Sequence, residues 1–242
     1  MLHLTHGIVL KTLRFSETSV IAHIYTEKFG RLAYIINGVH APKSKFKPAL
    51  LQVLTPLDMV SYYKEQKNLQ RLSEIKPLIL LQSIPFNIIK SSIVIFLSEI
   101  LYRVLQESES NPPLFQFLLH AIIHLDQSTD SLSNFPIVFL IQLSAYLGFF
   151  PDNNFFYTER AIFDLQEGNF THRLPDHPHH FGLPLSEAFA KALHTPLHEA
   201  HCLVITPSQR KALLHTLLHY YQLHISGFSE TKSLKILEEI MA

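Results

Sequence analysis

The chain has 242 residues, of which 47% are hydrophobic and 17% charged, a composition typical of a folded protein of one or two domains that excludes a disordered chain. A single cysteine, Cys202, excludes an internal disulfide framework and any zinc site built from several cysteines. Lys and Arg balance Asp and Glu at 20 each, so the whole chain is formally neutral.

The first 80 residues favour short β-strands. Segments rich in β-branched and apolar residues are separated by turns with glycine, proline or polar residues. They lie at 6–15, 19–26, 31–38, 54–64 and 69–77. Five such closely connected strands predict a small antiparallel β-barrel.

Beyond Pro77 the apolar residues recur at three- and four-residue spacing, which predicts amphipathic helices. The expected helices lie at 88–105, 111–127, 135–148, 185–194, 208–225 and 233–241. Asn111 is a candidate N-cap of the second helix, and the third is apolar nearly all round, so it is expected at the centre of the core. Residues 152–184 look irregular, with two short strands expected around a turn at 166–168.

These patterns predict an α+β chain of two domains. A small antiparallel barrel occupies residues 1–78, and an all-α domain with an irregular or hairpin insertion at about 152–184 occupies residues 79–242. The N-terminus lacks a basic region followed by an apolar one, so no signal peptide is expected. Glu99 and Arg103 interrupt the longest apolar stretch before it could span a bilayer. We therefore expect a cytoplasmic protein without a membrane partner.

The neutral total conceals a difference between the two expected domains. Residues 1–80 contain 11 Lys and Arg against 5 Asp and Glu, whereas the remainder contains 9 against 15. Three of the lysines, Lys43, Lys45 and Lys47, lie in the stretch GVHAPKSKFKPAL, which contains no carboxylate and has the prolines of a loop. This asymmetry favours a polyanionic partner for the basic part, and two ordinary solvated surfaces are the alternative.

Four motifs near the N-terminus resemble the opening of the bacterial DNA repair family RecO. They read GIVL, ETSV, EKFG and GVHAPKSK, and they occupy Gly7–Leu10, Glu17–Val20, Glu27–Gly30 and Gly38–Lys45. The match is dense over residues 5–47 and looser to about residue 80. The helical remainder agrees with the family in the order and length of its elements.

The resemblance implies an OB-fold followed by a helical domain, and a recombination mediator rather than an enzyme, with no cofactor and no catalytic residue. It implies binding of single- and double-stranded DNA and annealing of complementary strands. It also implies partnership with RecR and with the acidic C-terminal tail of the single-strand binding protein, so that RecA can replace that protein on DNA. Whether RecF takes part is left open. A protein–protein scaffold with an OB-like domain and no DNA contact is the alternative.

An OB-fold binds single strands with cations that follow the phosphates and aromatic rings on which bases stack. The candidate phosphate contacts are Lys11, Arg14, Arg31, Lys43, Lys45, Lys47, Lys64, Lys67 and Arg71. The candidate stacking residues are Phe46, Tyr62 and Tyr63. Adjacent strand residues point to opposite faces, so the alternative for Tyr62 and Tyr63 is that one of them packs in the core. The alternative for Phe46 is a structural role, in which its ring anchors the loop on the barrel.

Arg210 and Lys211 are the candidate contacts for the acidic tail of the single-strand binding protein. They stand at the start of an amphipathic helix whose apolar face includes Leu213, Leu214 and Leu217. A pocket for such a tail needs apolar walls and one or two cations, and both are present in this stretch. Helix capping and solvation by a basic pair is the alternative.

The sequence does not favour a metal site. Many RecO proteins carry a four-cysteine zinc module after the position of Gly148–Pro151, but residues 152–184 contain no cysteine here. Apolar packing of Phe163, Leu165 and Phe170 is expected to hold that region instead. Histidine pairs recur at four-residue spacing, at 120/124, 194/198 and 215/219, and a cluster lies in HPHHF at 177–181. They lack a third ligand in any known pattern, so a metal-dependent hydrolase is the weaker alternative. Cys202 is interpreted as a buried structural thiol.

Overall fold

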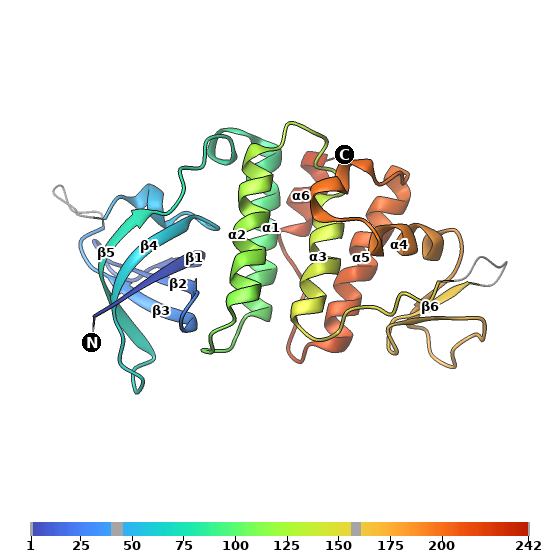
Figure 1. Ribbon diagram of the computed structural model, residues 1–242, viewed down its shortest axis with the longest axis horizontal. Helices are drawn as coiled ribbons and strands as arrows, with labels where there is room; N and C mark the ends of the chain where they lie inside the picture. The colour runs from blue at the N-terminus through green and yellow to red at the C-terminus, as the bar shows by residue number, and fades with distance from the viewer. Residues whose placement is uncertain (1, 40–45, 156–160, 242) are drawn as a thin grey trace. The chain divides into compact units, whose positions relative to one another are not determined.

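The structure is a computed structural model that describes residues 2–39, 46–155 and 161–241. The chain divides into two compact units, residues 1–128 and 129–242, which we call the barrel unit and the helical unit. Figure 1 shows the strands of the barrel together with α1 and α2, and the other helices with the small sheet near β6. The strands of the barrel end at Pro77, close to the predicted change from strands to helices, but the first two helices belong to the barrel unit.

The barrel unit opens with five strands. They are β1 (Leu2–Arg14), β2 (Val20–Thr26), β3 (Gly30–Ile36), β4 (Pro56–Tyr62) and β5 (Leu69–Pro77). The strands close into a barrel in the order β1-β2-β3-β5-β4, in which β3 and β5 pair in parallel and the other neighbours are antiparallel. This arrangement confirms the expected OB-type barrel.

β1 is long enough to pair with two neighbours. Its first half pairs with β4 and its second half with β2, with an irregularity between Val9 and Lys11. Gly7 lies where the two pairings overlap, and a Cβ atom there would meet the side chains of Ile24 at 2.6 Å and Met59 at 2.7 Å. The glycine of the GIVL motif therefore lets the barrel interior close, since a larger residue would force these two side chains to shift.

The core of the barrel consists of inward side chains from all five strands. They include Val9, Ile24, Tyr34, Leu57, Met59 and Leu72. β2 over its first half and β3 throughout alternate between buried residues and residues that are more exposed, as the period of a half-buried strand requires. Burial raises the pKa of the Tyr34 phenol to about 12. The phenol is therefore neutral at physiological pH.

The barrel unit continues with two helices, α1 (Ile88–Val104) and α2 (Pro112–Gln127). Asn87 caps α1 by accepting hydrogen bonds from the N–H groups of Ile89 and Lys90, and Asn111 caps α2, as predicted. Among the described residues, short 3-10 helices also lie at Pro48–Leu51, Ile84–Phe86 and Leu197–Cys202.

The segment between α1 and α2 lies against the hairpin that joins β2 and β3. The N–H of Arg31 donates to the carbonyl of Glu107 at 3.0 Å, and the Ser110 hydroxyl donates to the carbonyl of Glu27 at 2.9 Å. Gly30 has a φ of +61°, and a Cβ atom there would lie 2.5 Å from the carbonyl oxygen of Glu109. The glycine of the EKFG motif is thus required both by the turn and by the approach of this segment.

A buried polar network joins the segment after the barrel to both helices. The Asp126 carboxylate accepts hydrogen bonds from the N–H groups of Gln82, Ser83 and Ile84 at 2.8–2.9 Å. Burial raises the pKa of this carboxyl, but the three N–H donors outweigh burial and hold its pKa below the usual value. The Lys90 ammonium, which is also buried, donates to the carbonyl oxygens of Asp126 and Ser128.

The described part of the helical unit contains four α-helices. They are α3 (Phe135–Tyr146), α4 (Leu185–Leu193), α5 (Pro207–His224) and α6 (Leu234–Met241). α3 is buried along nearly its whole length, which confirms the expected central helix. Thr206 and Gln209 form a capping box at the start of α5. Across the described ranges, none of the helices has the length and apolar character needed to cross a membrane.

A three-stranded sheet lies between α3 and α4 in the chain. β6 (Ile162–Asp164) pairs with β7 (Asn169–Thr171) across the predicted turn, and also with β8 (His180–Phe181), which the sequence did not predict. Phe163 is fully buried, and its ring lies 4.9 Å from that of Phe170 and 4.7 Å from that of Phe189. Burial of Phe163, Leu165 and Phe170 confirms the expected apolar packing.

Candidate nucleic-acid interface

The lysine-rich loop is described only in part. Lys43 and Lys45 lie outside the described residues. Lys47 is exposed immediately before the turn at Pro48–Leu51. Phe46 is half-buried and packs against the barrel core, the location that the anchoring alternative predicts. Lys47 is thus the member of this loop that the structure places at the surface.

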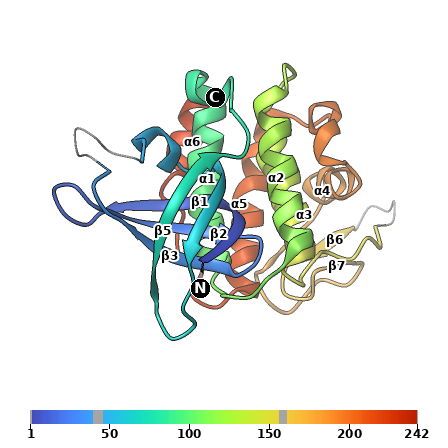
Figure 2. The same cartoon turned by 60° about the vertical axis from the view of Figure 1, so that its left-hand side comes forward.

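Lys64, Lys67 and Arg71 gather at the hairpin that joins β4 and β5. This hairpin extends beyond the barrel in Figure 2, and all three cations are exposed. The buried Gln70 side chain closes the hairpin, because its amide donates to the carbonyls of Lys64 at 2.8 Å and Lys67 at 2.6 Å and its oxygen accepts from the N–H of Lys64. The two lysines are therefore carried on a backbone that is already ordered, and no pattern in the sequence indicated this role for Gln70.

Arg14 ends β1 and leads into a tight turn at residues 15–19. The N–H groups of Phe15 and Ser16 donate to the carbonyl of Ser19, and the Ser19 hydroxyl donates to the Asn37 side chain at 3.1 Å. The Phe15 ring is 58% exposed on this turn. Phe15 does not stand out in the sequence, since its apolar character continues the strand pattern.

Lys11 and Arg31 occupy a different environment from the other cations. Both lie over the ring of Tyr102 on α1, with the Lys11 ammonium 4.5 Å and the Arg31 guanidinium 5.1 Å from its centroid. Arg31 also donates to the carbonyl of Tyr102 at 2.7 Å. These two candidate phosphate contacts therefore also hold α1 against the outer face of the barrel.

His23 lies between these two cations, opposite Lys11 on the neighbouring strand and edge-on to the Tyr102 ring. Burial, followed by the nearby charges of Arg31 and Lys11, lowers the pKa of His23 below its usual value. The imidazole of His23 is therefore neutral at physiological pH.

The two adjacent tyrosines differ as strand alternation requires. Tyr62 is 46% exposed on the outer face of β4. Tyr63 is half-buried, and its ring stacks on that of Phe29 at 4.3 Å and lies edge-on to His3. Tyr62 is therefore the member of the pair that a nucleobase could reach.

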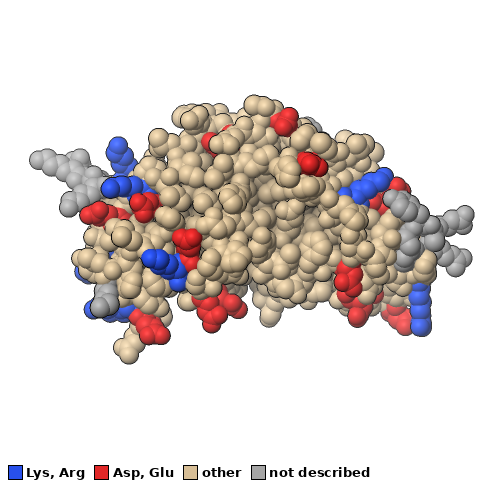
Figure 3. Space-filling model, viewed as in Figure 1, with Lys and Arg blue, Asp and Glu red and all other residues tan. Residues whose placement is uncertain are grey.

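The charges on the barrel are mixed on the visible face. Figure 3 shows Lys and Arg side chains over the barrel with Asp and Glu side chains among them. The excess of positive charge in residues 1–80 therefore does not form one continuous patch on that face. Contacts with phosphates would instead depend on the places where the cations gather, such as the hairpin between β4 and β5.

Arg210 and Lys211 line a cavity of about 400 Å³ in the helical unit. Its walls are largely apolar and include Pro136 and Ile137 of α3, Leu214 of α5, and Leu237 and Met241 of α6. The buried Asn134 side chain accepts a hydrogen bond from Arg210 Nε at 3.0 Å and donates to the carbonyls of Ala200 and Leu203. This network fixes Arg210 at the cavity wall.

Glu238 brings a negative charge to the same cavity. Its carboxylate lies 3.5 Å from the Lys211 ammonium and 2.7 Å from the His215 ring. An acidic ligand would therefore compete with Glu238 for Lys211, whereas Arg210 is bound to a neutral amide. Arg210 is the better candidate to receive a carboxylate.

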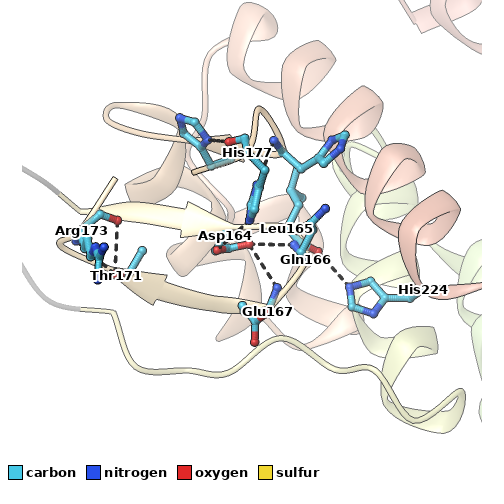
Figure 4. Close-up of polar contacts among 10 residues, drawn as sticks. Asp164, Leu165, Gln166, Glu167, Thr171, Arg173, His177 and His224 are labelled. Carbon is cyan, nitrogen blue, oxygen red and sulfur yellow. Dashed lines mark hydrogen bonds and ion pairs between the residues drawn. The ribbon is translucent and has the colours of Figure 1, made fainter. Parts of the chain in front are cut away.

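Histidines of the small sheet form hydrogen bonds instead of a metal site. Figure 4 shows Asp164 accepting from the N–H groups of Gln166 and Glu167, with His177 Nε2 at 3.3 Å. His224 donates to the carbonyl of Leu165 at 2.9 Å. Among the described residues, no group of three or more His, Cys, Asp or Glu side chains is arranged to hold a metal ion.

Cys202 lies at the surface, so its interpretation as a buried thiol was wrong. It ends the turn at Leu197–Cys202, where the apolar residue facing the core is Ala200. The residue buried at this point of the chain is the apolar neighbour, Leu203, and not the cysteine.

Comparison with known proteins identifies both parts of the chain. The family model described as Recombination protein O N terminal matches residues 1–80, and the model described as Recombination protein O C terminal matches residues 85–235. Proteins named DNA repair protein RecO are similar along the full length. The one from Phocaeicola vulgatus is 34% identical over 242 residues, which cover 100% of both chains. The one from Flavobacterium johnsoniae is 35% identical, with 98% of each chain covered.

The relative from Azobacteroides pseudotrichonymphae is 34% identical over 99% of both chains and carries the same name. These matches cover the barrel and the helices alike, so they extend the resemblance of the N-terminal motifs to the whole chain. The chain therefore belongs to the RecO family of DNA repair and recombination proteins.

Proposed function

We propose that this protein is a recombination mediator that binds single- and double-stranded DNA through its barrel and anneals complementary strands. Together with RecR it would help to load RecA onto DNA coated with single-strand binding protein, without a catalytic step of its own and in the cytoplasm. The observation that supports this proposal best is the closed OB-type barrel carrying exposed cations at the β4–β5 hairpin. Family membership supports the same proposal.

The cations expected to contact phosphates fall into two groups. Arg14, Lys47, Lys64, Lys67 and Arg71 are exposed. We propose these five, with Lys43 and Lys45 of the loop, as the main contacts. Lys11 and Arg31 already contact Tyr102, so we expect a smaller contribution from them. Flexible lysines recognise phosphates rather than base edges, and binding with little sequence preference should follow.

A salt titration tests the proposal and the scaffold alternative together. Binding of fluorescent single-stranded oligonucleotides of two unrelated sequences is measured from low to moderate salt. A mediator should bind both with similar affinity, and the affinity should fall steeply with salt because counterions are released. Changing Lys43, Lys45 and Lys47 to Ala should lower the slope of log K against log salt by up to ~2, since each contact contributes roughly 0.7.

The matched control changes three lysines of the helical unit, Lys191, Lys232 and Lys235, to Ala. This variant loses the same charge but should keep the wild-type slope. A wild-type protein that bound neither oligonucleotide would favour the scaffold alternative. An unchanged slope in the loop variant would remove those three lysines from the proposed contacts.

We further propose that the cavity beside Arg210 receives the acidic, apolar tail of the single-strand binding protein. Its apolar walls and the fixed guanidinium match the chemistry of such a tail. A fluorescent peptide with the tail sequence should bind the full chain, and Arg210→Ala should weaken it several-fold when measured well below the melting temperature of the variant. Arg173→Ala, an exposed arginine on another part of the same unit, is the control. Equal weakening by both variants would place the tail elsewhere.

A further inference from the structure

The outer face of the barrel carries an uncovered row of side chains that crosses the strands. Leu13 lies opposite Ile21, Ile21 opposite Ile35, Ile35 opposite Arg71, and Arg71 opposite Tyr62. Residues directly opposite one another on paired strands share a face, so these five side chains form one continuous line, which we call the open row. Leu13, Arg71 and Tyr62 are exposed, and Ile21 and Ile35 are half-buried.

The next row of the same face is occupied by the protein itself. Lys11 lies opposite His23, and both contact Tyr102 of α1. Farther along the same strands, Tyr25 stacks on Phe115 of α2 with ring centroids 6.3 Å apart. Helices thus cover one end of the face that OB-folds use for oligonucleotides, and the open row is the part that remains accessible.

Both ends of the open row carry a cation and an aromatic ring. Arg14 and Phe15 follow Leu13 in the chain, where the turn at 15–19 holds Phe15 outward. Tyr62 lies beside Arg71 at the other end, next to the ordered hairpin that carries Lys64 and Lys67. Glu17 and Glu65 lie in these turns, and Glu74 lies on β5 three residues beyond Arg71, outside the row.

We infer that the open row is the path of single-stranded DNA across this barrel, with bases stacked on Phe15 and Tyr62 and phosphates held by Arg14, Arg71 and the hairpin lysines. Aliphatic side chains between two rings suit the faces of bases, and the cations at the ends suit the backbone that joins them. Four inter-strand steps of about 4.8 Å separate Leu13 from Tyr62, roughly 19 Å along the surface, which accommodates several nucleotides. This inference rests on the proposed DNA binding and names its site.

The absence of tryptophan from the chain allows a direct test. Phe15→Trp and Tyr62→Trp each create a single fluorophore on the open row, and Phe86→Trp creates one at a ring that is 86% exposed on the turn before α1. Added poly-dT oligonucleotide should quench the first two and leave the third unchanged, because a stacked base quenches the indole. Equal emission changes at all three positions, or none at Phe15 and Tyr62 while DNA is bound, would overturn the inference.

Affinity provides a second measurement that separates stacking from charge. Phe15→Ala and Tyr62→Ala should each weaken binding of the oligonucleotide by about tenfold and leave the salt slope unchanged, since a ring contacts a base and not a phosphate. The penalty should disappear on an abasic oligonucleotide of the same length, which keeps the phosphates. Phe86→Ala should bind both oligonucleotides as the wild type does.

The outcomes separate this inference from the proposed function. If the wild type binds DNA with a steep salt dependence while Phe15→Ala and Tyr62→Ala match it, DNA uses another surface and the open row is free for a protein partner. If the alanine penalties persist on abasic DNA, the rings act through the fold and not by stacking, and the inference also fails. A wild type that binds no DNA at all overturns both.

Discussion

The Lys90 ammonium lies 2.8 Å from the carbonyl oxygen of Asp126, whose carboxylate accepts three N–H groups from the segment that leaves the barrel. Lys90 also donates to the carbonyl of Ser128 and to the hydroxyl of Ser83. The Lys90 ammonium thus donates to carbonyl groups at the carboxyl end of α2, where the helix dipole favours positive charge. The Asp126 carboxylate accepts the N–H groups of the turn before α1. Both side chains are buried, so we expect them to contribute to stability and not to binding.

Lys90→Met should therefore destabilise the barrel unit by about 2–4 kcal/mol, because the carbonyls of Asp126 and Ser128 and the hydroxyl of Ser83 all lose a charged, buried donor. Urea unfolding followed by circular dichroism measures the change. Lys76→Met removes an exposed lysine of β5 and should alter the midpoint little. Equal midpoints for the two variants would show that the buried ammonium contributes no more than a surface charge.

Gly30 should tolerate substitution less well than a glycine of similar backbone conformation in open space. Gly30 has a φ of +61° and would bring a Cβ atom to 2.5 Å from a carbonyl oxygen, whereas Gly148 has a φ of +84° with no atom within 4 Å of its Cβ position. Gly148→Ala should cost about 1 kcal/mol for the backbone alone. Gly30→Ala should cost at least about 2 kcal/mol more, measured as the difference in unfolding free energy. Similar costs would show that the segment after α1 moves aside easily.

His23 should make the barrel unit less stable in mild acid. Its pKa in the folded protein lies below the ordinary value of 6.5, so the unfolded chain binds the proton more readily. The stability that this difference represents is complete above about pH 6.5 and is lost as the pH falls toward the folded-state pKa. Between pH 7.5 and 5.5, His23→Gln should lose less stability than the wild type does.

The control for this measurement is His120→Gln, which changes an exposed histidine of α2. It should show the same loss between the two pH values as the wild type. If His23→Gln and the wild type lost equal stability, the cations beside His23 would not be opposing its protonation.

The small sheet of the helical unit should be stable without metal. The purified protein should contain no stoichiometric zinc, and excess chelator should leave its melting temperature unchanged. Asp164→Ala should destabilise the unit by about 1–3 kcal/mol, because two N–H groups of the turn lose their acceptor. Asp176→Ala, at an exposed position nearby, is the control. One tightly bound zinc per chain with a chelator-sensitive melting temperature would contradict this account.

The sequence predicted the elements well wherever hydrophobic periodicity decides the structure. The five strands, the Asn111 cap and the buried α3 are all local consequences of residue type and spacing. β8 was missed because two residues carry no usable periodicity, and its pairing depends on a distant strand. Cys202 was misplaced because burial at the end of a turn is decided by tertiary packing.

The candidate interface was predictable as a set of residue types but not as a surface. Charge and motif selected Lys11 and Arg31 together with Arg71, yet only the fold shows Tyr102 against the first two. Phe15 was overlooked for the converse reason, since an exposed ring and a core ring look alike in a strand pattern. The contacts of Arg31 and Lys11 with Tyr102 join residues 71 and 91 positions apart, and no local pattern contains this information.

The contacts of the Asp126 carboxylate also determine where the chain can be divided into stable fragments. The two family models meet between residues 80 and 85, which is where a fragment for expression would ordinarily be divided. Gln82, Ser83 and Ile84 are held there by Asp126, and Gly30 lies against Glu109. A fragment ending near residue 80 would expose the ring of Tyr25 and lose every partner of Arg31 on α1. We expect the shortest soluble DNA-binding fragment to end at Ser128, and proteases to spare residues 81–84 in the intact chain.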